Sequence, residues 1–318
     1  MLRAAGLAGL AAALPGRTMA AIDPFIPQRA SARVIIDNDF AGDPDGLVAL
    51  AHQLLTPKTR VVLVTSSALD PKLAGNVPVG ATAKAGRDIA LELMSRGSMK
   101  PVPTLAGSES LGAGPAQMSD AARGIVAEAM RDDPLPLFIT CGGPLTNIAA
   151  ALRQEPEIAS RATLVWIGGG RYPEGGWEYN LNTDIEAARQ VIERSAIPIW
   201  QIPQNAYRLM QVSNAELRTR MRSISPFGRW LYERFTSPPS FIDVGGSWPL
   251  GDSPTVLLTA ISQESSNVRE QWARRIGSDG RYGDTTEGRR LRVFETLDLR
   301  LTFEDFLALL EIRTTKGY

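Results

Sequence analysis

Short apolar runs alternate with segments of helical periodicity from residue 33 to about residue 200. The apolar runs predict strands at 33–36, 61–65, 102–105, 137–140, 163–167 and 197–201. Between them, apolar residues recur at helical spacing, which predicts helices at 46–55, 81–95, 121–130, 145–152 and 184–194. Alternating strands and helices are typical of a mostly parallel central sheet flanked by helices on both faces. We therefore expect an α/β fold.

Local signals refine this pattern at two helix starts and in one loop region. Thr183 with Glu186, and Ser213 with Glu216, have the spacing of a capping box. Residues 225–251 are rich in proline, glycine and aromatic side chains, and we expect them to form loops over the rim of the sheet.

Polar segments follow four of the predicted strands. Ligands of such sheets bind beyond the carboxyl ends of the strands, so these segments should gather on one rim and form the active site. The four segments are DNDFAGDPDG (37–46), TSSALD (65–70), TCGGPLTN (140–147) and IGGGRYPEGGWEYN (167–180).

Composition narrows the function. Lys+Arg and Asp+Glu both number 34, so no net charge would attract nucleic acid. No apolar run approaches the roughly 20 residues of a membrane-spanning helix. The single cysteine, Cys141, excludes an internal disulfide and a cysteine-based zinc cluster. The single histidine, His52, lies within a predicted helix, where we expect a structural role.

The N-terminus reads as a targeting segment. MLRAAGLAGLAAALPGRTMA combines an early arginine, a small-residue apolar stretch and Thr18-Met19-Ala20 as a cleavage site. We expect residues 1–31 to be an export signal or a disordered leader, and residues 32–318 to form a single domain. If residues 1–20 are a signal peptide, we expect a periplasmic or secreted protein; if they are not, we expect a cytoplasmic one.

The acidic loop DNDFAGDPDG holds four aspartates within ten residues. Carboxylates held close together repel and are costly to desolvate, so they need a cation or full contact with water. Asp39 and Asp45 flank a turn, and hard oxygen ligands of this kind suit Ca²⁺ or Mg²⁺. An Asx-rich turn with a helix N-cap is the alternative interpretation.

Five segments in the same order resemble one family. VIIDNDFAGDPDGLVAL (34–50) resembles the Asp-Thr-Asp-Pro-Gly-x-Asp-Asp-Ala signature of the nucleoside hydrolases, the inosine-uridine-preferring family. PVPTLAGSESL, GGPLTNIAAAL, IGGG with WEYNLNTDIEAA, and GDSPTVLLTA are similar to its later motifs. The matches span roughly residues 33–260. Agreement across several separate motifs is strong support. The resemblance implies a Rossmann-like α/β fold.

The resemblance also implies a metal and a reaction. One Ca²⁺ would be held by Asp39, Asp45, Asp252 and the backbone carbonyl of Gly142. A carbonyl ligand is expected to tolerate any side chain at position 142. A metal-bound water, whose proton Asp39 takes, would attack the anomeric carbon of a ribonucleoside and release ribose and free base.

Further family positions imply how the sugar is held. Asp43 matches the ribose-binding aspartate, and Glu178 and Asn180 match sugar contacts. The early loop is one residue longer than the family pattern, so Asp43 or Asp45 could be the second metal ligand. Ser67 lies where the family has an asparagine after the second strand, and either Ser67 makes a shorter hydrogen bond or the contact is lost.

The departing base is less defined. Many family members carry a histidine before the late aspartate, and this chain has Gly251 there. A purine could instead be protonated by solvent while stacked on an aromatic ring, which favours a purine nucleoside. Aromatic residues in the rim segments are Trp177, Trp248, Tyr172 and Phe241.

Two other functions stay open at this point. Asp37-Asn38-Asp39 has the Asp-x-Asp form of Mg²⁺-dependent phosphohydrolases, although the lysine and threonine of that chemistry cannot be placed. Alternatively, the chain binds a nucleoside or sugar without catalysis, but retention of Asp39 argues against this. The family also implies a homodimer or homotetramer.

Overall fold

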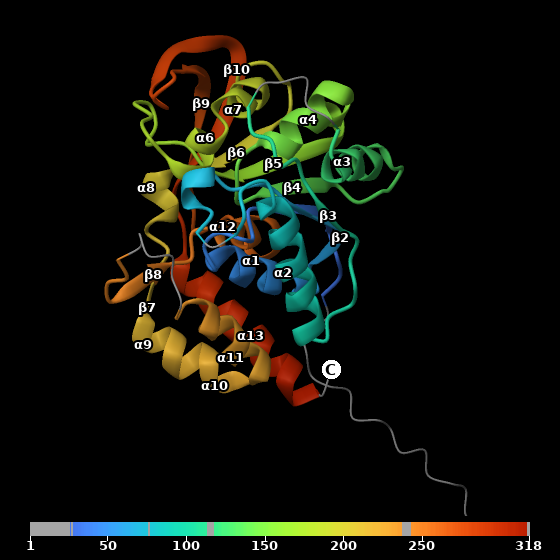
Figure 1. Cartoon of the computed structure of the whole chain (residues 1–318), viewed down its shortest axis with the longest axis vertical. Coiled ribbons are helices and arrows are strands. Elements are labelled where there is room, and N and C mark those ends of the chain that lie inside the picture. The colour runs from blue at the N-terminus through green and yellow to red at the C-terminus, as the bar shows by residue number, and fades with distance from the viewer. Residues whose placement is uncertain (1–25, 27, 76, 113–117, 237–242, 317–318) are drawn as a thin grey trace, which may run out of the picture.

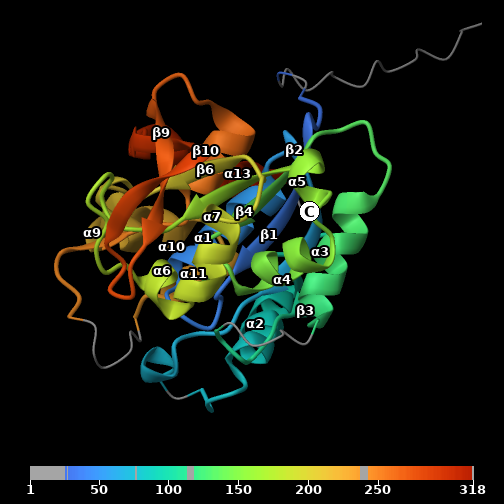
Figure 2. The ribbon, with the colours of Figure 1, turned by 90° about the horizontal axis from the view of Figure 1, so that it is seen from above.

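Parallel strands form the centre of the protein, as the computed structural model shows for residues 26, 28–75, 77–112, 118–236 and 243–316 (Figure 1). The eight-stranded sheet has the order β3-β2-β1-β4-β5-β6-β10-β9, and all neighbours pair in parallel except β10 with β9. Figure 2 shows β3 and β9 on opposite sides of the molecule. The strands are β1 (Ala32–Asn38), β2 (Thr59–Ser66), β3 (Thr104–Ala106), β4 (Leu137–Cys141), β5 (Ala162–Ile167), β6 (Ile199–Ile202), β9 (Asn267–Ile276) and β10 (Tyr282–Thr296). A separate antiparallel pair contains β7 (Gln211–Ser213) and β8 (Ser247–Pro249).

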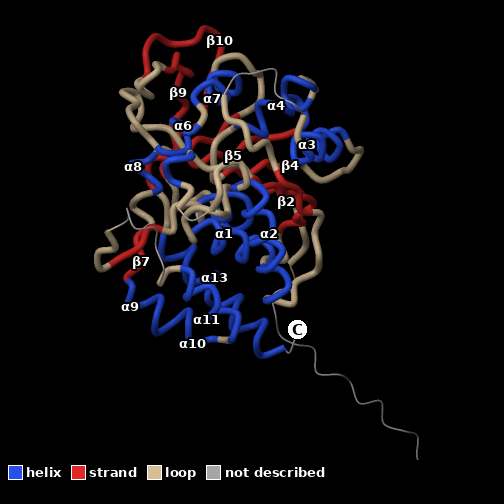
Figure 3. Tube along the Cα trace, in the orientation of Figure 1, coloured by secondary structure: helices blue, strands red, loops and turns tan. Residues whose placement is uncertain are grey.

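Helices lie on both sides of the strands (Figure 3). The longer helices are α1 (Asp45–Leu55), α2 (Thr82–Arg96), α3 (Asp120–Met130), α4 (Thr146–Gln154), α7 (Ile185–Ile192), α11 (Pro226–Arg234) and α13 (Leu299–Lys316). The shorter ones are α5 (Ile158–Arg161), α6 (Tyr179–Thr183), α8 (Gln204–Tyr207), α9 (Asn214–Glu216), α10 (Arg222–Ile224) and α12 (Pro254–Val256). A 3₁₀ turn, η1 (Pro71–Leu73), and two π-helical segments, η2 (Leu217–Met221) and η3 (Leu257–Ile261), complete the described elements.

The sheet separates two apolar layers because successive side chains of a strand point to opposite faces. Ile35 of β1 belongs to the cluster with α3, α4 and α7. Its neighbours Val34 and Ile36 belong to the cluster with α1, α2, α11 and α13. Both faces of the central strands are therefore buried, which explains why these strands read as continuous apolar runs.

The predicted α/β class and its elements are confirmed. All six predicted strands and all five predicted helices occur, with ends displaced by a few residues. The capping box at Ser213 and Glu216 is also confirmed. The other capping box is wrong: Asp184 caps α7, and its side chain accepts a hydrogen bond from the Ala187 N–H at 3.0 Å. Asp184 is one residue closer to the helix and ends up in the N-cap position.

The prediction of rim loops at 225–251 is wrong in part. This segment contains α11, which packs with α2 and α13 in the core, and β8, which pairs with β7. Pro226 at the first helical position starts α11, because proline fixes a helical φ there. The division into a leader at 1–31 and a domain at 32–318 stays a prediction, because residues 1–25 lie outside the described residues. Within the described part of the chain, no helix is both long and apolar enough to cross a bilayer.

Candidate active site at the carboxyl ends of the strands

The central strand β1 positions the acidic loop between its two neighbours. Asp37 of β1 lies in register with Thr65 of β2 on one side and Cys141 of β4 on the other. The loops that leave these three strands are therefore adjacent. The Ser67 N–H donates to the Asn38 carbonyl at 2.9 Å, and the Gly142 N–H donates to the Asp37 carbonyl at 3.0 Å. The rim expected from the sequence is formed.

The negative charges of the carboxylates in the site raise the pKa of one another. Burial raises the pKa of Asp39 well above its usual range, and the charges of Asp43 and Asp45 raise it further. Burial also raises the pKa of Asp45, with Asp252 as the next cause. The pKa of Asp252 is raised by burial and by Asp39 and Asp43, against a lowering hydrogen bond from Asn38. The chain thus brings Asp252 to the acidic loop across more than two hundred residues.

Asn38 is central to this arrangement, although its role was not predicted. Its Nδ2 donates to Asp252 Oδ2 at 2.9 Å, and the bond is buried. The Asn38 Oδ1 atom is buried and has no hydrogen-bond partner among the described residues. The side chain fills the space that side chains at Gly46 and Gly142 would need: a Cβ on Gly46 would lie 2.7 Å from Asn38 Oδ1. The Asp-Asn-Asp motif could have pointed to this residue, but the contact with Asp252 is long-range.

The expectation that position 142 tolerates any side chain is wrong. A Cβ on Gly142 would overlap Asn38 Nδ2 and lie 2.6 Å from Asp252 Cγ and 2.7 Å from Asp252 Oδ1. Glycine is required because the amide and the carboxylate approach the backbone there. The same distances show that Asp252 Oδ1 lies beside the Gly142 backbone, whose carbonyl was the predicted ligand.

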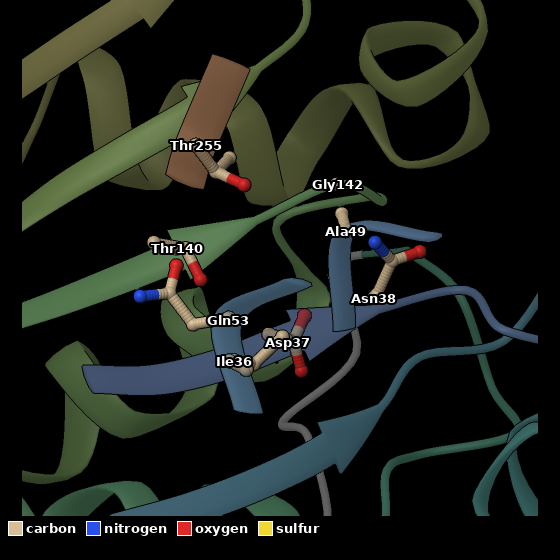
Figure 4. Close-up of a pocket in the computed structure, with 8 residues that line it drawn as sticks. All are labelled: Ile36, Asp37, Asn38, Ala49, Gln53, Thr140, Gly142 and Thr255. Carbon is tan, nitrogen blue, oxygen red and sulfur yellow. The ribbon is translucent and has the colours of Figure 1, made fainter. Parts of the chain in front are cut away.

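A small polar cavity lies behind this cluster (Figure 4). Its volume of about 10 Å³ is about the minimum that a single water molecule needs. Asp37 on its wall accepts hydrogen bonds at Oδ1 from Thr65 Oγ1 at 2.5 Å and from Asn147 Nδ2 at 2.8 Å. Burial raises the pKa of Asp37 to about 6. The cavity is lined by Ile36, Asp37, Asn38, Ala49, Gln53, Thr140, Gly142 and Thr255.

The site fits a hard cation by the chemistry of its donors, but does not form a closed ligand shell. Carboxylate, amide and carbonyl oxygens are the ligands that Ca²⁺ prefers. Buried Asn38 Oδ1 and Ser67 Oγ, both unpartnered within the described ranges, face this region. Within the same ranges, no three His, Cys, Asp or Glu side chains come close enough together to hold a metal ion. Asp43, which is exposed, and Asp45, which is half-buried, are both near enough to raise the pKa of Asp39.

Two of the predicted sugar contacts, Glu178 and Asn180, lie at the end of β5, and a third, Ser67, directly follows β2. Glu178 is fully buried and caps α6, accepting hydrogen bonds from the Asn180 and Leu181 N–H groups. Asn180 donates through Nδ2 to the Ile167 carbonyl at 2.9 Å, and its Oδ1 has no partner in the described structure. Ser67 is buried, and a Cβ on Gly143 would lie 2.7 Å from its Oγ and 3.4 Å from the Asp39 Cβ. The structure therefore places Ser67 next to Asp39.

Trp248 is not available to stack on a base. Its side chain is 4% exposed and packs edge-on against Phe235 in the core. β8 carries it inward, whereas the sequence predicted a rim loop. Tyr172 packs against Tyr282, and Phe241 lies outside the described residues.

The remaining aromatic and the single histidine differ in exposure. Trp177 is 64% exposed and directly precedes Glu178 in the chain. His52 is fully buried in α1, and its Nε2 lies 2.8 Å from Asp305 Oδ2 of α13. The expected structural role of His52 agrees with this position.

The sheet and its acidic rim define an α/β protein with an oxygen-lined site at the carboxyl ends of the strands. The sequence model of the family described as inosine-uridine preferring nucleoside hydrolase matches residues 34–297. The chain therefore belongs to this family of glycosyl hydrolases, and the predicted recognition and enzyme class are confirmed at the level of the family.

Relatives and solved structures agree with this assignment. The pyrimidine-specific ribonucleoside hydrolase RihA of Salmonella paratyphi A is 29% identical over 212 residues, 60% of this chain and 66% of that protein. The chain matches between 33% and 66% of the length of the first curated relatives. The plant nucleoside hydrolase PpNRh1 has a TM-score of 0.65 at 22% identity and covers 90% of this chain and 99% of its own. A purine-preferring ribonucleoside hydrolase from Gardnerella vaginalis has a TM-score of 0.66 at 19% identity, covering 89% and 99%. At these identities the two structures support the fold.

Proposed function

We propose that this chain hydrolyses the N-glycosidic bond of a ribonucleoside, releasing ribose and free base, and that the reaction depends on Ca²⁺. The observation that carries the proposal is the placement of Asp39, Asp45 and Asp252 on one rim, where their charges raise the pKa of one another, in a member of this family. The Asp-x-Asp phosphohydrolase alternative is not favoured, because Asp37 is buried and already bonded to Thr65 and Asn147.

Asp39, Asp45, Asp252 and the Gly142 carbonyl would hold the cation, with Asp43 as the alternative to Asp45. When bound, Ca²⁺ lowers the pKa of a coordinated water and orients sugar hydroxyls. Asn38 orients Asp252: its amide occupies Oδ2 and leaves Oδ1 beside Gly142. Orientation of a ligand by a neighbouring hydrogen bond is a general feature of metal sites.

Asp39 is proposed to accept the proton of the attacking water. A general base must be ionised to accept a proton, and a bound cation favours the ionised form of Asp39, whose pKa burial together with Asp43 and Asp45 otherwise raises. The surrounding carboxylates also stabilise the positive charge that develops on the sugar in an oxocarbenium-like transition state. Asp43, Ser67, Glu178 and Asn180 are proposed to contact the sugar.

The base is proposed to be a purine. Trp177 supports this, because it is exposed, it directly precedes Glu178 in the chain, and a purine offers a large stacking surface. The printed names of the relatives include both pyrimidine-specific and purine-preferring hydrolases. A panel containing inosine, guanosine, adenosine, uridine and cytidine separates the two preferences, and faster turnover of uridine or cytidine overturns the purine proposal.

The central test is reducing-sugar release from that panel, with and without a Ca²⁺ chelator. We expect release to stop on chelation, to return with added Ca²⁺, and to be lost in Asp39→Asn. Asp132→Asn is the matched control, because Asp132 is exposed and precedes the amino end of β4, at the end of the sheet opposite the rim. Calorimetric Ca²⁺ binding that weakens in Asp252→Asn gives a second readout. Sugar release that persists in chelator overturns the Ca²⁺ dependence, and binding of nucleosides without turnover overturns catalysis.

We also propose export and self-association. The composition of residues 1–20 supports export, and the family resemblance supports a homodimer or homotetramer. Cell fractionation with mass determination of the mature N-terminus tests the first, and light scattering on the purified protein tests the second. A full-length cytoplasmic protein or a monomer overturns the respective proposal.

A further inference from the structure

Glu178 has a full set of hydrogen-bond donors. Oε2 accepts from the Gly169 N–H at 2.7 Å and the Leu181 N–H at 2.9 Å. Oε1 accepts from the Asn180 N–H at 3.1 Å and from the Tyr207 hydroxyl at 2.8 Å. A carboxylate has about four acceptor positions, so these donors saturate it. The side chain is also fully buried, and a sugar hydroxyl cannot reach it while all four bonds persist.

The four donors differ in how easily they can move away from the Glu178 carboxylate. Three are backbone N–H groups, and those of Asn180 and Leu181 belong to the first turn of α6, which Glu178 caps. The fourth is a side-chain hydroxyl on α8, a single-turn helix after β6, and the Tyr207 side chain is half-buried. Rotation of one side chain frees the Tyr207 position, whereas release of the others would require the backbone to move.

We propose that the Tyr207 hydroxyl holds the place of a sugar hydroxyl on Glu178 and is exchanged for it when substrate binds. The inference rests on the proposed function, because it takes Glu178 as a sugar contact. Tyr207 is then a specificity residue. A ligand that brings a hydroxyl to this position restores the fourth bond, whereas a deoxy ligand that displaces Tyr207 leaves a buried carboxylate one donor short.

The position of the Tyr207 ring agrees with this role. A Cβ on Gly251 would lie 3.1 Å from Tyr207 Cδ2 and 3.1 Å from Asp45 Oδ2. The ring therefore lies against Gly251, between Glu178 and the acidic loop, and the missing side chain at position 251 makes room for it. Burial and the Glu178 carboxylate raise the pKa of Tyr207, so the hydroxyl stays protonated and exchanges as a neutral donor for a neutral donor.

Tyr207→Phe tests the exchange, because it removes the hydroxyl and keeps the ring. In the wild type a sugar must displace a bond to a charged group, and in the variant that bond is already missing. We expect the Kd of D-ribose, measured by calorimetry with Ca²⁺ present, to fall about tenfold in the variant. KM for a hydrolysed nucleoside should fall in parallel. A Kd that is unchanged or higher overturns the inference and indicates that Tyr207 only positions Glu178.

Two comparisons make the test specific. Tyr282→Phe is the matched control: the Tyr282 hydroxyl accepts from Gln201 Nε2 at 3.0 Å and makes no hydrogen bond to Glu178, so we expect unchanged ribose affinity. In a Glu178→Gln background, Tyr207→Phe should no longer lower the Kd of D-ribose. A Kd that still falls in this background overturns the inference. Among 2′-, 3′- and 5′-deoxynucleosides, the one that lacks the exchanging hydroxyl should bind Tyr207→Phe no more tightly than the wild type. An equal increase in affinity for all three overturns the inference.

The outcome is separable from that of the proposed function. If the wild type releases sugar from no nucleoside, the proposed hydrolysis fails, while the ribose titration still tests the exchange. If nucleosides are hydrolysed and Tyr207→Phe shows no tighter binding, only the exchange fails. Ribose that binds to neither protein overturns the exchange.

Discussion

Replacement of Asp37 by asparagine should stabilise the metal-free protein, although it removes a charge from the proposed active site. Asp37 is fully buried, and both of its strong donors, Thr65 Oγ1 and Asn147 Nδ2, bond to Oδ1. The amide oxygen of Asp37→Asn can accept both bonds. The amide nitrogen of the asparagine takes the place of Asp37 Oδ2, which lies 3.6 Å from Cys141 Sγ. The substitution therefore removes the buried charge and keeps the two hydrogen bonds to Oδ1, at the loss of the weak bond from the Cys141 thiol.

The magnitude follows from the pKa of Asp37, which burial raises from 3.8 to about 6. Because the folded pKa lies above the unfolded one, the folded state holds the proton more tightly. The stability that this provides is fully present below pH 3.8 and is lost as the pH rises through about 6. The ionised side chain thus costs about 3 kcal/mol above pH 7. Asp37→Asn carries no charge at this position. We therefore expect its free energy of unfolding to exceed that of the wild type by about 3 kcal/mol at pH 8.

Denaturant unfolding in chelator at pH 8 and pH 5 measures this advantage. The difference in free energy of unfolding between the two proteins should be about 1.4 kcal/mol smaller at pH 5 than at pH 8, because the wild-type carboxyl takes up its proton. This change corresponds to about 3 °C in Tm. The raised pKa values of Asp45 and Asp252 affect both proteins alike. Loss of the Asp37 charge removes one of the causes that raise the pKa of Asp39, which adds to the stability of the variant at pH 8. With excess Ca²⁺ the advantage should shrink, since a nearby cation favours ionised Asp37. A variant that is no more stable than wild type at pH 8 in chelator, or a gap that is independent of pH, refutes the reasoning.

Three further predictions concern the same rim and the core beside it. Gly142→Ala should lower Ca²⁺ affinity at least tenfold in calorimetry, because its Cβ overlaps the Asn38–Asp252 pair, while Gly245→Ala, which has open space, should bind like wild type. Asn38→Asp replaces the donor to Asp252 with another carboxylate, so its Tm in chelator should fall by several degrees and recover with Ca²⁺; a Tm equal to wild type contradicts the assigned hydrogen bond. His52→Gln should lower Tm by a few degrees and leave kcat within twofold, because His52 is buried in α1; loss of kcat at unchanged stability would show that His52 acts in the reaction.

The sequence by itself determined the sheet, its helices and the rim that carries the acidic groups. Continuous apolar runs and helical periodicity are local signals, and strands buried on both faces, such as β1 and β4, leave a clear pattern. The carboxyl-end rule then placed Asp39, Ser67, Gly142 and Glu178 on one rim without knowledge of any contact. The end of the chain was less predictable, because the antiparallel pair β9 and β10 is largely exposed and polar.

Only the tertiary structure decided which of these side chains meet. Asn38 and Asp252 are 214 residues apart, and nothing local to either indicates their hydrogen bond. Trp248 looked like a rim aromatic because its neighbours are turn-forming residues, but pairing of β8 with β7 turns it into the core. Tyr207 carries no motif, and it reaches Glu178 because β5 and β6 are adjacent in the sheet. Periodicity records which face of an element is buried, whereas such partners depend on the order of the strands.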